Sequence, residues 1–481
     1  MSKENDSMKL DSISGSLPKD MQYFNRLLAV DSNFDVIHRV IHIGDREACM
    51  YLIDGFCKDE IVQKILQYFM DIKKDEVPKD AHEMSKKKLP YFEVDITRDW
   101  KEIVDFLLAG VFVLLVDGYD KAVLIDARTY PARSVEEPEK DKALRGSKDG
   151  FVETIVFNTA LIRRRIRSTE LRMEMMNAGE SSKTDIVICY MHDRVNPRYL
   201  EEIKRRIQNI HVDSLTMNQE SLAECLYQRR WYNPFPKFKY SERPDTAAAQ
   251  VLEGNIVILV DNSPTAIFLP ATFFDILEEA DDYYFPPITG TYLRVTRFLI
   301  AVLTYLVTPT FLLLVNYPQF VPEGLSFILL KEPPNIPILF QFLLLELAID
   351  GLRLAAINTP NMLSTPLSVM AALVLGEFSV NSGWFSAEVM LYMAFVAIAN
   401  YTQANYELGY ALKFMRILNL ILTQIFGMGG YIAGIIILLV SIASNKTIFH
   451  TSYLYPLIPF DSEKLKNRLI RKRLPGALNK K

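Results

Sequence analysis

An uncharged apolar run over residues 298–315 constrains this 481-residue chain more than any other feature. Its length is about that needed for a helix to cross the hydrocarbon layer of a bilayer. Further apolar blocks follow at residues 336–357, 366–379, 385–402, 409–426 and 428–444. Because lipid cannot hydrogen-bond backbone N–H and C=O groups, we expect these blocks to be helices packed on one another. The sequence therefore predicts an all-α polytopic membrane domain behind a large charge-rich front end.

Basic residues near the ends of the apolar blocks predict the orientation in the membrane. Arg294 and Arg297 precede the first block, and Lys464, Lys466 and Arg468 belong to a basic tail. Since Lys and Arg concentrate on the cytoplasmic side of membrane helices, both ends of the chain are predicted to be cytosolic. That requires an even number of crossings. Six crossings fit, and so do four crossings with a re-entrant hairpin at residues 366–402.

The front end is predicted to be a cytosolic α/β region. Apolar runs on both sides of Asp117-Gly118 indicate a β-hairpin after a helix at residues 97–108. The same order of helix, strand, turn and strand recurs at residues 246–269, which predicts two related α/β subdomains joined by a helix. The predicted boundaries are a disordered tail at 1–30, a first subdomain at 31–132, a linker with an arginine-rich helix at 133–178, a second subdomain at 179–290, the membrane domain at 291–445 and a basic cytosolic tail at 446–481.

The linker helix, predicted over residues 151–173, is rich in arginine. It carries Arg163, Arg164, Arg165, Arg167 and Arg172. The simplest interpretation is a solvated helical face with salt bridges. The alternative is a coupling helix that contacts an acidic neighbour, the membrane surface or another subunit.

The sequence contains no pattern that indicates catalysis. There is no phosphate-binding loop, and the six histidines and four cysteines lack catalytic or metal-type spacing. No basic patch with interleaved aromatic residues suggests nucleic acid. An acidic patch at residues 275–282 is either a cation site or, more simply, a solvated turn. We therefore predict no enzyme, no catalytic residue, no cofactor, no metal and no nucleic-acid partner.

Ionisable residues inside the apolar blocks are candidate functional groups. Glu346, Asp350 and Arg353 have i, i+4, i+7 spacing, which places them on one face of a helix. Such groups are costly at membrane depth unless they are paired or hydrated. They either line a water-filled path or pair internally as a structural clasp. Glu377 and Glu388 flank a turn at residues 381–383, at an outer mouth or at a wet interface position.

A stripe of small side chains marks the block before that turn. Ser364 and Ser368 are followed at helical spacing by Ala371 or Ala372, and then by Leu375 on the same face. Small faces let membrane helices approach closely, which is one interpretation. In the other, this helix from several subunits surrounds an axial pore, and Leu375 forms an apolar constriction.

Several motifs carry a resemblance to a known family. They include Arg-Ser-Val-Glu-Glu-Pro at 133–138, Asn-Pro-Phe-Pro at 233–236, Tyr-Glu-Leu-Gly at 406–409 and Tyr-Leu-Tyr-Pro at 453–456. With these motifs the chain resembles the A subunits of bacterial spore germinant receptors, the GerA family. The matching motifs run in order from about residue 130 to residue 456.

The resemblance implies a multi-pass protein of the inner membrane of the bacterial endospore. It implies an oligomeric, pentameric ion channel that releases monovalent cations in germination, with residues 364–378 as the pore helix. The implied partners are the lipid bilayer, other spore germination membrane proteins and a small accessory membrane subunit. Residues 282–291 and 376–378 depart from the general receptor pattern, which favours amplification over direct nutrient sensing. Two alternatives remain: a secondary transporter with its site near residues 427–430, and a scaffold for the germination machinery.

Overall fold

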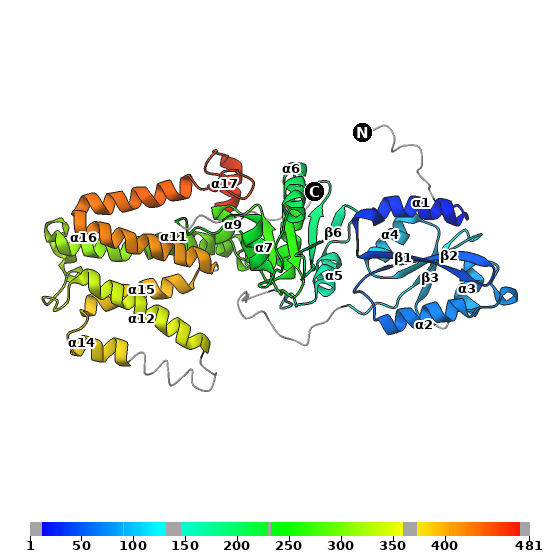
Figure 1. The fold of residues 1–481 in the computed structure, drawn as a ribbon, viewed down its shortest axis with the longest axis horizontal. Coiled ribbons are helices and arrows are strands. Elements are labelled where there is room, and N and C mark those ends of the chain that lie inside the picture. The colour runs from blue at the N-terminus through cyan, green and yellow to red at the C-terminus, as the bar shows by residue number, and fades with distance from the viewer. Residues whose placement is uncertain are drawn as a thin grey trace. The chain divides into compact units, whose positions relative to one another are not determined.

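The computed structural model describes residues 12–89, 91–130, 146–228, 232–358, 373–403 and 405–471 (Figure 1). The chain divides into two compact units. The α/β unit comprises Met1–Gln228 and Tyr240–Pro270, and the helical unit comprises Arg229–Lys239 and Ala271–Lys481.

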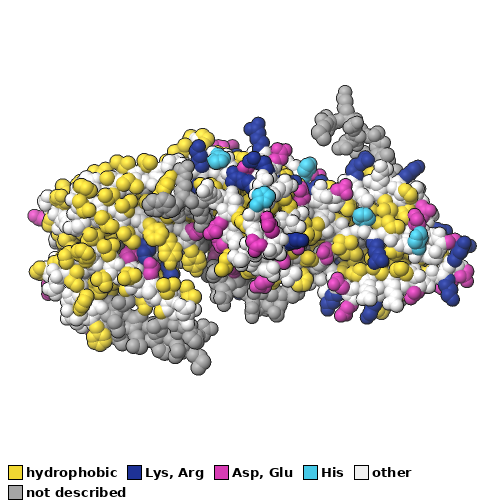
Figure 2. Space-filling view, in the orientation of Figure 1, with side chains coloured by type: hydrophobic (Ala, Val, Ile, Leu, Met, Phe, Trp, Pro, Cys, Tyr) yellow, Lys and Arg dark blue, Asp and Glu magenta, His cyan; other side chains and the backbone are white. Residues whose placement is uncertain are grey.

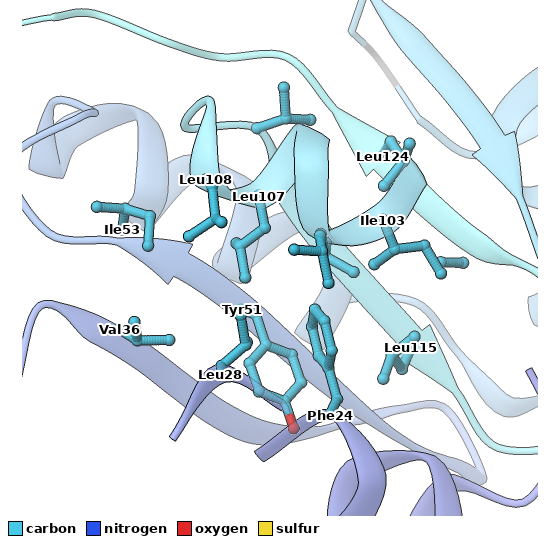
Figure 3. Close-up of a cluster of buried hydrophobic side chains, with 14 of the residues drawn as sticks. Phe24, Leu28, Val36, Tyr51, Ile53, Ile103, Leu107, Leu108, Leu115 and Leu124 are labelled. Atoms are coloured by element: carbon cyan, nitrogen blue, oxygen red, sulfur yellow. The ribbon is translucent and has the colours of Figure 1, made fainter. Parts of the chain in front are cut away.

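The first sheet of the α/β unit has five antiparallel strands covered by helices on both faces. Its order is β1 (Val36–Ile43), β2 (Arg46–Ile53), β4 (Phe112–Val116), β5 (Ala122–Ile125) and β3 (Val94–Thr97). α1 (Leu17–Leu28) and α4 (Trp100–Leu108) cover one face, and α2 (Asp59–Met70) and α3 (Ala81–Lys87) cover the other. Because both faces are covered, every residue of β4 and β5 is buried, which explains their unbroken apolar runs. Figure 3 shows the hydrophobic core between the sheet and α1 and α4, in which Phe24 packs edge-on against Tyr51.

The second sheet repeats the strand order of the first. It consists of β6 (Leu171–Ala178), β7 (Thr184–Met191), β9 (Ile256–Val260), β10 (Ala266–Leu269) and β8 (Lys239–Ser241). α5 (Ile155–Arg165) and α8 (Pro244–Leu252) pack on one face, and α6 (Pro197–Gln208) and α7 (Gln219–Leu226) complete the subdomain. The prediction of two related α/β subdomains is confirmed.

Two sequence predictions about this unit are wrong in part. The tail predicted to be disordered at residues 1–30 contains α1, whose Leu17, Phe24 and Leu28 are buried. The arginine-rich helix predicted over residues 151–173 ends at Arg165, and β6 begins at Leu171. In both cases charged residues obscured the periodicity of apolar residues that would have indicated a helix or a strand, because the apolar residues that face the core are few and widely spaced.

The described part of the helical unit contains four apolar helices of 15 to 38 residues. They are α11 (Pro287–Asn316), α12 (Ile338–Asn358), α15 (Ala387–Tyr401) and α16 (Tyr406–Ala443). Among the described residues, α11 and α16 are long and apolar enough to cross a membrane. Hydrophobic side chains cover much of the face of this unit that Figure 2 shows. Its shorter elements are α9 (Phe273–Leu277), α10 (Asp281–Tyr284), a π-helical segment at Leu373–Phe378, α14 (Ser379–Asn381), α17 (Ser462–Leu469) and 3₁₀ turns at Pro318–Phe320 and Glu323–Ile328. The α/β unit has 3₁₀ turns at Val30–Ser32 and Lys74–Glu76.

α16 is a hairpin of two helices rather than one rod. Gly427 has φ 58° and ψ −132°, which breaks the helix and turns the chain back. A Cβ atom on Gly430 would lie 1.8 Å from the backbone oxygen of Leu422, and one on Gly434 would lie 2.2 Å from Asn419 Oδ1. These close approaches pair the two arms across the turn. Gly427 therefore turns the chain, and Gly430 and Gly434 allow the two arms to pack closely.

Replacing Gly430 with alanine is expected to destabilise the helical unit by about 1–3 kcal/mol, because the added methyl forces the two arms apart. The thermal unfolding midpoint of the detergent-solubilised protein would measure this effect. Gly429→Ala is the matched control, since a Cβ atom there meets nothing within 4 Å. Equal midpoints for the two variants would contradict the close packing of the arms.

Candidate functional site

Two acids of α12 face two basic residues of the first arm of α16. Glu346 Oε1 accepts a hydrogen bond from Arg416 Nε at 2.9 Å and a second from the same guanidinium. Lys413 Nζ lies 3.3 Å from Glu346 Oε2 and also forms an ion pair with Asp350. The i, i+4 spacing of the acids and the i, i+3 spacing of the bases put each pair on one helical face, so the four charges meet.

The four charges of this cluster differ in burial. Glu346, Lys413 and Arg416 are buried, whereas the Asp350 side chain keeps 32% of its surface exposed. Arg416 also donates to the Thr304 carbonyl of α11 at 3.0 Å. The cluster thus ties three helices together and presents one carboxylate at the surface of the helical unit.

Polar contacts continue along the same face of α16. Asn419 donates to the Tyr305 hydroxyl of α11 at 3.0 Å, and Thr423 donates to Asn419 Oδ1 at 3.3 Å. Beyond the turn, the hydroxyls of Thr310 and Tyr431 lie 2.8 Å apart. A column of hydrogen-bonded polar side chains therefore extends from the charge cluster between α11 and the α16 hairpin.

The structure separates the other predicted charges from this cluster. The Arg353 guanidinium lies over the rings of Tyr401 and Tyr410, at 4.9 and 5.4 Å from their centroids. Glu388 accepts a hydrogen bond from the backbone N–H of Lys331 at 3.4 Å, and Glu377 is exposed. The charge of Arg353 is thus stabilised by two aromatic rings through cation–π interactions.

The small-residue stripe remains a sequence prediction. Ser364, Ser368, Ala371 and Ala372 lie outside the described residues. Leu375 lies in the segment Leu373–Phe378, and its side chain is also outside the described part of the chain.

Lys413 and Arg416, the basic partners of these acids, were not among the residues predicted for the site. Their three-residue spacing within an apolar block was the available signal. Two basic groups on one face of a membrane helix need carboxylates, and Glu346 and Asp350 are acids of an earlier block.

Arg163 of the arginine-rich helix is buried and reaches the first subdomain. Its guanidinium donates to the two oxygens of Asp35 at 2.7 and 2.8 Å. Asn33 Oδ1 accepts from Arg163 at 3.3 Å and from the backbone N–H of Met173 at 2.9 Å. Arg164 of the helix is exposed, as a solvated face requires, and Arg167, just beyond the end of the helix, is exposed too. The helix therefore has both predicted features: a charged outer face and contact with an acidic neighbour.

The acidic patch at residues 275–282 is not a solvated turn, contrary to the simpler prediction. Asp275, Glu278 and Asp282 are buried. Arg468 of α17 lies 2.6 Å from Asp275 and 2.6 Å from Glu278, and Arg294 and Arg297 of α11 pair with Glu278 and Asp282 at 2.9 and 3.0 Å. Within the described ranges, no group of three or more His, Cys, Asp or Glu side chains is arranged to hold a metal.

Glu278 is the centre of this acid–arginine network. Burial alone disfavours its charged form, but Arg468, Lys239 and Arg294 outweigh it and hold the pKa of Glu278 below its usual value of 4.5. Because this pKa is lower in the folded protein than in the unfolded chain, the unfolded chain binds more protons in acid. Glu278 thus contributes stability above pH 4.5, and this contribution is lost as the pH falls through the folded-state pKa.

The unfolding midpoint of the protein in detergent is accordingly expected to fall as the pH drops below about 4.5. Glu278→Gln is expected to have a lower midpoint at pH 7, where the arginines have lost their carboxylate, and a smaller further decrease in acid. Glu323→Gln, at an exposed loop position, serves as the control with an unchanged profile. Parallel pH profiles for wild type and Glu278→Gln would show that Glu278 makes no such contribution.

Two α/β subdomains followed by long apolar helices define a membrane protein with a large α/β unit. The chain belongs to the GerA spore germination protein family: residues 22–481 match the family described as Bacillus/Clostridium GerA spore germination protein. The predicted resemblance is thereby confirmed. Members of this family are germination proteins rather than enzymes, which confirms the prediction that the chain is not an enzyme.

Relatives match nearly the whole chain. Stage V sporulation protein AF of Bacillus subtilis (strain 168) is 38% identical over 460 residues, covering 95% of this chain and 93% of that protein. Spore germination protein KA of the same organism is 28% identical, covering 95% of this chain and 85% of that protein. The uncharacterized membrane protein YfkQ is also 28% identical, over 95% and 89% of the two chains.

A solved structure matches the first part of the chain. It is the crystal structure of the N-terminal domain of the A subunit of the Bacillus megaterium spore germinant receptor GerK3. The match covers 55% of this chain and 99% of that one, with 27% identity and a TM-score of 0.43.

Proposed function

We propose that the protein is a subunit of a pentameric ion channel in the inner membrane of the spore. The channel releases monovalent cations during germination, and it amplifies a signal that other germination proteins detect. Both termini are cytosolic, and a small accessory membrane subunit together with other germination proteins completes the assembly.

Asp350 carries the proposal. It lies among apolar helices and forms an ion pair with Lys413, and 32% of its side-chain surface is exposed. A carboxylate that faced lipid would cost several kcal/mol, so this surface favours water or another subunit. The described part of α12 extends to Asn358, and Ser364, where the stripe begins, is six residues further along the sequence. A ring of subunits would enclose a path that these two adjoining segments share.

The glycines that favoured a secondary transporter now have a structural explanation. Gly427 makes the hairpin turn, and Gly430 and Gly434 allow its arms to approach. Broken helices in transporters instead use their free ends to bind substrate. The glycine cluster therefore gives no support to a substrate site.

Planar-bilayer recording of the purified protein, paired with its mass in detergent, tests the proposal. We expect discrete cation-selective conductance steps from a five-subunit assembly, with candidate germination partners added where the protein alone is silent. An intact oligomer that stays silent with those partners would leave the scaffold as the better function.

Asp350→Asn is expected to reduce the preference for cations over anions, because it removes a negative charge from the path. Ser368→Phe is expected to reduce the conductance to near background by filling the pore, and Leu375→Ser to raise open probability by wetting the constriction. Glu323→Gln and Ser326→Phe, both at exposed loop positions, are the matched controls. Unchanged currents in all three test variants, with normal assembly, would remove these segments from the pore.

A further inference from the structure

The segment 457–471, here called the tail segment, exposes an unusual set of apolar side chains. Leu457, Ile458 and Phe460 precede α17, Leu469 is its last residue and Ile470 follows it, with Phe460 exposing 70% of its surface. Single exposed apolar residues are ordinary, but five large ones within 14 residues of sequence indicate contact with another apolar phase.

Positive charge accompanies these apolar side chains. Lys464 and Lys466 of α17 are exposed, whereas Arg468 turns inward to Asp275 and Glu278. The sequence beyond the described residues continues with Lys472 and Arg473. A short helix with outward lysines beside exposed apolar side chains has the composition of an interfacial membrane-binding segment.

Hydrogen bonds fix the depth of the tail segment relative to the first apolar run. The backbone N–H of Arg471 donates to Thr291 Oγ1 at 3.1 Å, and Arg294 donates to the carbonyls of Asn467 and Arg468 at 3.1 and 3.2 Å. An α-helix rises about 1.5 Å per residue, so Thr291 and Arg294 lie about 6–10 Å before the run that starts at Phe298. The headgroup layer of a leaflet is about 5–8 Å thick, so these contacts lie within it or at its outer edge.

We propose that the tail segment binds the anionic lipid surface next to the N-terminal end of α11. Phe460 and its apolar neighbours enter the boundary between headgroups and acyl chains, and Lys464 and Lys466 pair with lipid phosphates. The acid–arginine network holds α17 at this depth through Arg468. The proposal does not depend on channel activity.

Spin labelling of the full-length protein tests this placement. The label is introduced by Phe460→Cys in a Cys225→Ser background, since Cys225 is the exposed one of the four cysteines, and the unsubstituted background serves as the blank. The protein is reconstituted in vesicles of phosphatidylglycerol and phosphatidylethanolamine, or of phosphatidylcholine. The collision rate of the label with oxygen reports its exposure to lipid, and the collision rate with a water-soluble nickel complex reports its exposure to water. Labels at Leu391, exposed on α15, and at Phe92, exposed in the α/β unit, give lipid and water references.

In the anionic vesicles the label at position 460 is expected to collide with oxygen in preference to nickel, between the two references. In phosphatidylcholine it is expected to shift toward the water reference. Lys464→Gln with Lys466→Gln should lower the equilibrium constant between the lipid-bound and the water-exposed tail segment about fivefold for each charge removed. Lys19→Gln with Lys101→Gln, exposed in the α/β unit, should have no effect. A water-like label in both lipids would overturn the proposal, and so would a label shielded from both reagents, which would indicate a protein partner or a second copy.

Discussion

Replacing Arg416 with methionine is expected to destabilise the helical unit by about 3–5 kcal/mol. Arg416 is buried, and its guanidinium holds Glu346 and the Thr304 carbonyl at once. Its removal leaves the Glu346 carboxylate buried with Lys413 alone, and Lys413 is shared with Asp350. A buried carboxylate that keeps only a shared cation is costly, so this loss is much larger than that of an exposed ion pair.

The unfolding midpoint and the denaturant dependence of the protein in detergent measure this loss. Lys466→Met is the matched control, because it removes an exposed cation without breaking a buried pair. The double variant Glu346→Gln/Arg416→Met removes both charges and is expected to recover part of the stability. If Arg416→Met unfolds at the same point as Lys466→Met, the cluster does not stabilise the packing of α12 on α16.

The same double variant separates the two roles open to the cluster. Asp350 and Lys413 remain in place, so a cluster that acts only as a clasp should regain conductance together with stability. A variant that is stable but has lost cation conductance would show that Glu346 itself takes part in permeation. The burial of Glu346 and the exposure of Asp350 lead us to expect the first result.

Elements with unbroken apolar runs were predicted well from the sequence. β4 and β9 are buried along their whole length, so their five apolar residues mark them without reference to any partner. α1 and β6 were missed because each buries one narrow face and exposes charge on the other. In β6, Leu171 and Met173 are buried while Arg172 and Glu174 between and beside them are partly exposed, a short alternation within a charged stretch.

The candidate site was only half predicted, for a physical reason. A carboxylate in an apolar block is conspicuous by itself, so Glu346 and Asp350 were identified from local sequence. Which bases they meet depends on how α12 packs against α16, and helical spacing within one block carries no information on the neighbouring helix. The burial of Arg163 was missed for the same reason, since Asp35 lies 128 residues away in the chain.

Replacing Arg163 with methionine is expected to cost the α/β unit about 3–5 kcal/mol. Asp35 would then be a buried carboxylate without its cation, and Asn33 would lose one of its donors. Asp35 adjoins β1 of the first sheet, and Arg163 lies on the helix that packs on the second sheet. The variant should therefore loosen the two sheets together.

Hydrogen–deuterium exchange of the full-length protein would resolve this effect by segment. We expect faster exchange of the amides in both β1 and β6 in Arg163→Met. Little change is expected in Arg167→Met, because the side chain of Arg167 is exposed. The cycle of Arg163→Met, Asp35→Ala and the double variant then gives the coupling between the two residues. A coupling near zero, with faster exchange in only one sheet, would mean that the subdomains are stabilised separately; a large coupling with both sheets affected would mean that this single ion pair makes them one cooperative unit.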